Sequence, residues 1–327
     1  MPTTGPSSKV SPNGVAADSG LQTLGFALPN FLRCVWVHDG ARLNWQPRID
    51  KIVRAWQEIE WLSVVEHVRP CVLCTIPADC WDDLRGRGAK ASLSIEPLMV
   101  KRNARAVPGR RGSAAEPSAL SMRAVIGARK DAKRFARAWS NGDIAGVGAL
   151  LGYPECCCRF FVETMLQQDR QELLWAVASH SSKGDADRHC LEIDGKSEAN
   201  VFWRYLGVKA VPHIPCRFDC AGSLQLARLL ADVGRRSGYA EEVEWISQML
   251  RWPLEWSMLH GIAELKTPIL KVCTNAVASS SKYTIRWRGD LYPEDGAQGV
   301  AFPFRRPAFS TSGRFIEGLN IIYPGKQ

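Results

Sequence analysis

The chain has 327 residues, of which 46% are hydrophobic and 23% charged, and it carries a formal net charge of +9 at pH 7. These values are typical of a globular protein with one large domain or two ordinary ones, so its core needs no disulfides or metal to form. No apolar run approaches the roughly 18 residues that a bilayer-spanning helix requires, which excludes a membrane partner. The positive charge is compatible with anionic partners such as nucleotides, RNA or acidic peptides.

Cysteine usage indicates a reducing compartment. The chain contains 11 cysteines, but its first residues are rich in Ser, Pro, Gly and Thr and lack the apolar segment of a secretory signal. We therefore expect a cytoplasmic location, where thiols stay reduced. In that compartment clustered cysteines are more often metal ligands or catalytic groups than disulfides.

The N-terminal part of the chain predicts a disordered tail followed by a small α/β domain. Residues 1–20 are polar and bury too little apolar surface to order themselves. The elements that follow are a buried strand (31–38), a helix with Pro47 at its start, a second strand (68–76) and a short helix (77–84). They form a βαβα unit, which we assign to a domain over residues 21–99.

A basic linker is predicted over residues 100–117. Its five basic residues surround Pro108-Gly109 and are Lys101, Arg102, Arg105, Arg110 and Arg111. A charge run of this kind is usually a solvated loop, and only secondarily an arm that contacts RNA or another anion.

Residues 118–327 predict a larger domain of mixed helices and strands. Strands are expected over residues 122–127, 257–275 and 283–287. Helices are expected over residues 130–140, from Asp143 to Leu151 and over 239–251, and one more follows each of the two cysteine motifs described below. We therefore predict an α/β protein of the α+β type, with a small N-terminal unit and a larger domain. The helix over 130–140 has a basic face of Arg129, Lys130, Lys133, Arg134 and Arg137, which is expected to be exposed.

Two cysteine motifs about 60 residues apart share one layout. The first runs from Leu151 through Pro154 to Cys158 and ends in three adjacent cysteines, and the second runs from His213 through Pro215 to Cys220. A proline precedes the cysteines in each, and an amphipathic stretch follows, so both motifs predict helix starts. Unsatisfied N–H groups and the positive end of a helix dipole favour thiolate over thiol.

These motifs predict a Cys/His metal site where the two helix N-termini meet. Cys216 and Cys220 are four residues apart and would share one face of a helix, with His213 just before it. At most two of the three adjacent cysteines can converge on one point, and we favour Cys156 and Cys157. Sulfur and nitrogen donors in this number suit a tetrahedral zinc site or the ligand shell of an iron–sulfur cluster.

The remaining cysteines predict packing. Cys71 and Cys74 have C-x-x-C spacing, but they lie on a predicted strand, where residues three apart face opposite sides and cannot easily share a metal. Free cysteine is among the most buried residue types. The same interpretation applies to the isolated cysteines, which are Cys34, Cys80, Cys158, Cys190 and Cys273.

Two acidic residues are candidate catalytic groups. Glu155 and Asp219 lie within the motifs and would serve as acid/base groups or orient metal ligands, although both also fit as ordinary first-turn helix carboxylates. Tyr153 either positions a substrate or packs. His260 and Glu264 would share one side of a strand, where a hydrogen-bonded pair at a sheet edge is favoured over a metal or acid/base pair.

The two motifs resemble those of an uncharacterised prokaryotic domain family of unknown function. That family has an LGYP-x-C-C motif and an H-x-P-C-x-x-x-C motif, which match LGYPECC, followed by Phe160-Phe161, and HIPCRFDC, followed by a helix. The resemblance covers about residues 122–234 and, more loosely, the C-terminal third. It implies a site at the motif residues but no particular reaction, and Cys158 exceeds the motif's cysteine pair.

Three functions remain open. The first is a metal- or iron–sulfur-dependent enzyme of sulfur transfer or of small-molecule, peptide or RNA modification. The second is a binding protein with structural zinc whose basic segments hold RNA or another anion. The third is a scaffold without metal, in which the thiols belong to the core. The sequence has no Gly-rich loop of the P-loop or dinucleotide-binding type, which disfavours nucleotide-dependent enzymes.

Overall fold

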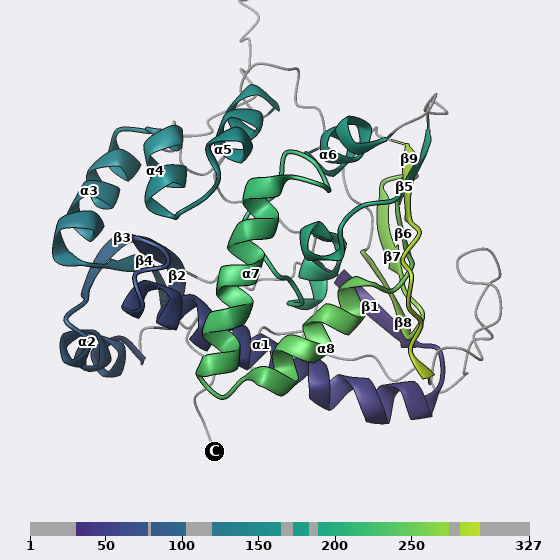
Figure 1. Cartoon of the computed structure of the whole chain (residues 1–327), viewed down its shortest axis with the longest axis horizontal. Helices are drawn as coiled ribbons and strands as arrows, with labels where there is room; N and C mark the ends of the chain where they lie inside the picture. Colours follow the sequence, from purple (N-terminus) through teal and green to yellow (C-terminus); the bar gives the residue numbers. More distant parts are fainter. Residues whose placement is uncertain are drawn as a thin grey trace, which may run out of the picture.

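The computed structural model describes residues 31–77, 80–102, 120–164, 173–182, 189–274 and 282–294 (Figure 1). The predicted tail and most of the predicted linker lie outside these ranges. The described residues form two β-sheets and the helices packed against them, which confirms the mixed α/β class. None of the described helices is both long and apolar enough to cross a membrane.

The larger sheet has six strands in the order β1-β8-β7-β6-β9-β5. Neighbouring strands are antiparallel except β5 and β9, which are parallel. In chain order the strands are β1 (Phe31–Trp36), β5 (Cys190–Ile193), β6 (Leu254–Leu259), β7 (Ile262–Lys266), β8 (Leu270–Thr274) and β9 (Tyr283–Trp287). The predicted break at Thr267-Pro268 forms the turn between β7 and β8, where the Thr267 hydroxyl accepts a hydrogen bond from the Leu270 N–H.

The smaller sheet has three antiparallel strands in the order β2-β4-β3, which are β2 (Cys71–Pro77), β3 (Ser94–Arg102) and β4 (Leu120–Gly127). Its two faces belong to different cores. Cys71 packs with Phe135 and Trp139 of α3 (Arg129–Ser140) and with α4 (Ile144–Leu150), whereas Cys74 packs on the side of Trp61 and of α2 (Trp81–Lys90). The two cysteines therefore face opposite sides of β2, as predicted.

Helix α1 (Asp39–Val65) connects the two sheets. Its first two thirds bury Trp45, Ile52 and Ile59 in the main core, together with α7 (Ala221–Arg236), α8 (Ala240–Leu250) and one face of the larger sheet. Its last turns place Trp61 and Val64 against the smaller sheet. Figure 1 shows α1 extending beneath α7 and α8 from the larger sheet to the smaller one.

Strand pairing crosses the boundary that we expected between two domains. β1, from the first part of the chain, pairs along its length with β8, and β4 completes the sheet of β2 and β3. Both sheets thus take strands from either side of residues 100–117. The reason is that a local pattern of apolar residues predicts a strand but does not specify its partner.

Several predicted boundaries shift. Helix α1 begins at Asp39 and contains Pro47, because the His38 imidazole caps it by accepting from the Ala41 N–H. The helix expected from the first motif to about His180 is described as α5 (Glu155–Val162) and α6 (Leu173–Ser181), with residues 165–172 outside the described part. The second motif precedes its helix, since α7 begins only after Cys220.

Replacing Ile52 with alanine tests whether α1 belongs to the same cooperative unit as the larger sheet. Ile52 is fully buried against α7 and α8, so the variant should lose about 2–5 kcal/mol of unfolding free energy in urea. Leu43→Ala on the same helix is the control, since Leu43 is 66% exposed and should change stability by less than about 0.5 kcal/mol. If the variant showed a separate early unfolding transition while the transition of the larger sheet stayed unchanged, α1 and that sheet would not share one core.

Candidate metal centre

The first pair of cysteines lies in the first turn of α5. Pro154 is the N-cap residue, and its carbonyl accepts from the N–H groups of Cys157 and Cys158. Arg69 fixes the turn that leads into this helix, because its buried guanidinium donates to the Leu151 carbonyl at 2.8 Å. The helix start is therefore held from the side of the smaller sheet.

The second pair lies on the loop that leads into α7. Phe218 anchors this loop, since its ring is fully buried against Phe202 and Trp287, and its N–H donates to the Ser181 hydroxyl at 2.8 Å. A turn closes from the Cys220 N–H to the Arg217 carbonyl at 3.2 Å. The expected helical face with Cys216 and Cys220 one turn apart is thus wrong, because a pinned loop brings these two residues back toward each other.

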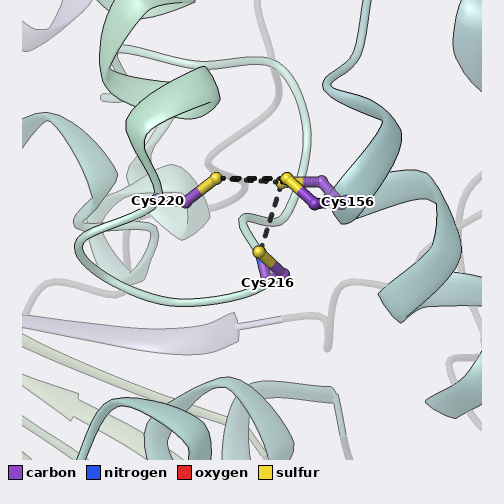
Figure 2. Close-up of side chains that lie close together, drawn as sticks. Cys156, Cys216 and Cys220 are labelled. Carbon is purple, nitrogen blue, oxygen red and sulfur yellow. Dashed lines mark hydrogen bonds between the residues drawn. The ribbon is translucent and has the colours of Figure 1, made fainter.

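Four cysteines converge between α5 and this loop. The ligand atoms of Cys156, Cys157, Cys216 and Cys220 all lie within 4.8 Å of one another, so this set could hold a metal ion. The Sγ of Cys220 lies 3.6 Å from that of Cys156 and 3.6 Å from that of Cys157, and the latter two are 3.9 Å apart. Figure 2 shows the sulfurs of Cys156, Cys216 and Cys220 pointing toward a common point from the two segments.

Gly222 allows the two helix starts to meet. A Cβ atom at this position, in the first turn of α7, would lie 2.8 Å from the Pro154 Cβ, which is closer than real side chains approach. The approach places two positive helix-dipole ends next to the sulfurs. It also leaves the Cys216 N–H free to donate to the Cys157 Sγ at 3.3 Å.

Three of the four thiols have shifted pKa values, and the shifts differ in direction. Hydrogen bonding from Cys157 lowers the pKa of Cys220, and the same contact together with burial raises the pKa of Cys157. Burial and the neighbouring sulfurs raise the pKa of Cys216. Of Cys157, Cys216 and Cys220, Cys220 therefore ionises first, and a bound cation would favour the thiolate form of the other two.

His213 lies beside the sulfur cluster and not within the converging set. Its Nε2 is 2.8 Å from the Ser223 Oγ, which in turn is 3.3 Å from the Cys157 Sγ. The imidazole is 6% exposed and stacks at 5.0 Å on the ring of Tyr153. Its Nδ1 is buried with no hydrogen-bond partner among the described residues, and such an atom typically costs about 1–3 kcal/mol.

The two predicted catalytic carboxylates lie at the surface. Glu155 is exposed in the first turn of α5, and Asp219 is exposed and accepts from the Arg217 guanidinium at 3.0 Å. Neither ligand atom belongs to the converging set.

Cys158 turns away from the cluster and packs against Gly148, where burial raises its pKa. His260 lies in the β6–β7 turn at a φ of 51°, while Glu264 of β7 pairs with Lys266 and Lys271. The expectation that His260 and Glu264 share one side of a strand is therefore wrong, since the turn separates them.

A cavity of about 140 Å³ adjoins the cluster and was not predicted. Cys157, Tyr153 and His213 line it, and so does Arg204 of the 3-10 helix η5 (Phe202–Leu206). The sequence could have indicated that Ser223 lies next to the cysteines, because it follows Cys220 by three residues, which is about one helical turn. Of the cationic side chains near this cavity, Arg69 is far in the sequence from Arg204 and Lys209, and the three form no motif that would have predicted it.

Comparison with protein-family models, curated proteins and solved structures finds no match to this chain. The resemblance to the prokaryotic family stays a prediction, and the function has to be inferred from the geometry of the cysteines and their surroundings.

The buried imidazole should make stability depend on pH. Burial, with Arg204 and Arg69 nearby, lowers the pKa of His213 to about 3, below its ordinary value of 6.5. The unfolded chain therefore binds one more proton between these values. We expect the free energy of unfolding to fall by up to about 1.4 kcal/mol per pH unit as pH drops from 6.5 toward 3.

His213→Gln removes the titrating ring while keeping a group that reaches Ser223, so this variant should lose most of that pH dependence. The control is His67→Asn, because His67 is exposed and Asn tolerates its φ of 57°. Urea titrations at pH 7, 6 and 5 measure the effect, and equal slopes in wild type and His213→Gln would contradict it.

Proposed function

We propose that this chain is a zinc protein in which one ion is held by Cys156, Cys157, Cys216 and Cys220. The spacing of the sulfurs carries the proposal. A zinc ion about 2.3 Å from each of four thiolates places the sulfurs about 3.8 Å apart at the corners of a tetrahedron. The three sulfur–sulfur distances of 3.6, 3.6 and 3.9 Å match this edge.

The same spacing favours one ion over an iron–sulfur cluster. In a cluster the thiolates bind different iron atoms, and the iron and sulfide between them hold the cysteine sulfurs farther apart. Four sulfurs that all lie within 4.8 Å of one another are spaced to hold a single ion. A single iron would also accept a tetrahedral set of sulfurs, and metal analysis distinguishes the two.

Four sulfur ligands favour a structural role. Catalytic zinc keeps one coordination position for water or substrate, whereas four thiolates fill a tetrahedral ion. The geometry therefore supports a binding protein with structural zinc more than an enzyme of sulfur transfer. The ion would fasten the start of α5, which packs against α4, to the start of α7, which is packed in the main core.

Metal analysis of the purified protein tests the proposal. We expect one zinc per chain, and Co²⁺ substitution should give the visible absorption bands of a tetrahedral thiolate site. Cys216→Ser should weaken zinc binding by more than about 100-fold, since losing a ligand exceeds the effect of losing an outer hydrogen bond. Competition with a chromogenic chelator measures the affinity.

Cys158→Ser is the matched control, because this residue adjoins the ligands in sequence but packs away from them. It should leave zinc content and affinity unchanged. Iron with labile sulfide, or a wild-type protein that binds no metal, would contradict the proposal. Equal zinc loss in Cys158→Ser and Cys216→Ser would show that the ligand set is wrong.

Gly222→Val should reduce zinc affinity without touching a ligand. The added side chain would push α7 away from Pro154 and separate Cys220 from Cys156, so we expect a loss of about 10–100-fold, as for outer-shell changes. Gly86→Val on α2 is the control, because a Cβ at Gly86 would meet nothing within 4 Å. Chelator competition is again the measurement, and equal affinities for the two variants would contradict the close-approach argument.

A further inference from the structure

The cavity beside the sulfur cluster is lined by apolar and by polar side chains. Its walls are largely apolar and include Val147, Leu151 and Phe161, while its polar groups are supplied by Tyr153, Arg204 and His213. Its volume of about 140 Å³ is close to that of cavities that hold benzene, about 150 Å³. The space therefore fits a small molecule with one polar head and one apolar body.

Among the described residues, two further cationic side chains and one carboxylate lie near Arg204 at the cavity. Arg69 is 1% exposed, and Arg204 and Lys209 are partly buried near it. The one carboxylate among these groups is Glu60, whose oxygens lie 3.5 Å from the Arg69 Nη1 and 4.0 Å from the Lys209 Nζ. Among the described residues, the ionisable groups near these cations also include Tyr153, Tyr205, His213 and Cys158.

The neighbouring cations affect the protonation of Lys209. Burial lowers the pKa of Lys209, and Arg204 and Arg69 lower it further while Glu60 opposes them. Three cations held near one carboxylate repel one another in a region of low dielectric. An anion bound in the cavity against Arg204 would relieve that repulsion.

His213 provides a second, independent indication of a ligand. Its Nε2 is held by Ser223, and its Nδ1 is buried with no partner among the described residues. Buried polar atoms of side chains are normally satisfied by protein, water or ligand. Because His213 lines the cavity, an acceptor placed there would satisfy this nitrogen.

We infer that the cavity binds a small organic acid, with its carboxylate against Arg204 and the His213 Nδ1–H and its apolar body between Val147, Leu151 and Phe161. The planar guanidinium matches the two oxygens of a carboxylate. The apolar walls select an acid with an apolar body over inorganic phosphate. This inference goes beyond the zinc site and does not require a metal, since none of the groups named here is a proposed ligand of the ion.

Calorimetric titration of the full-length protein as purified tests the inference, with benzoate and benzamide as probes. The two molecules have nearly the same shape and differ in charge, so we expect benzoate to bind at least about 10-fold more tightly. Arg204→Gln should abolish this preference. Arg235→Gln, which removes an exposed arginine paired with Asp232 on α7, should retain it.

Ile144→Trp is a second variant that does not remove a buried charge. Ile144 lines the cavity and is partly exposed, so a larger ring there should fit without unfolding the protein and should block both probes. Circular dichroism and zinc content of each variant show whether fold and metal site are intact. Equal affinity for benzoate and benzamide, no binding of benzoate to wild type, or undiminished binding to Ile144→Trp would overturn the inference, whatever the zinc content.

Discussion

The site depends on the close approach of two helix starts from distant parts of the chain. The starts of α5 and α7 meet where Gly222 faces Pro154, and the Sγ atoms of Cys157 and Cys220, 63 residues apart in sequence, come within 3.6 Å. Two positive helix-dipole ends side by side repel each other and leave N–H groups without acceptors. Ionised sulfurs between them compensate both effects, and a cation then compensates the repulsion among the sulfurs. The helix starts favour ionised sulfurs, and the ionised sulfurs in turn favour a cation, so a metal ion suits this location.

The proline-led motifs indicated which cysteines converge, but the local reason differs for the second pair. A separation of four residues suits both one turn of a helix and a loop that closes on itself, and Cys216 and Cys220 use the loop. The choice is made by Phe218, whose ring is held by Phe202 and Trp287 and whose N–H is held by Ser181. These contacts are tertiary, so the pattern of the motif alone could not have revealed them. For Cys156 and Cys157 the expectation of a helix start holds, because Pro154 terminates the preceding loop and caps α5.

The difference between what a local sequence pattern predicts and what tertiary contacts decide also applies to the fold and to the arrangement of charges. Individual elements such as α3 and β9 follow from their residue patterns, since Phe135 and Trp139 of α3 recur at helical spacing and β9 alternates buried and less buried residues. The pairing of β1 with β8 does not follow, because its partner lies more than two hundred residues away and nothing local specifies it. The net charge of +9 likewise does not show that Arg69 and Lys209 both pair with Glu60.

The cysteine cluster, which is the proposed zinc site, and the cavity are linked by a chain of polar contacts through Ser223. With Nδ1 unprotonated, the His213 Nε2–H donates to Ser223, and the Ser223 hydroxyl donates to the Cys157 sulfur, which stabilises its negative charge. A carboxylate at Nδ1 requires a proton on that nitrogen, so Nε2 then accepts a hydrogen bond from the Ser223 hydroxyl. The hydroxyl no longer donates to the Cys157 sulfur. An acid bound in the cavity would thus leave Cys157 with the Cys216 N–H as donor and would make it a more basic ligand. If both proposals hold, binding of the acid and binding of the metal would be coupled through the Ser223 hydroxyl, and that coupling would act in both directions.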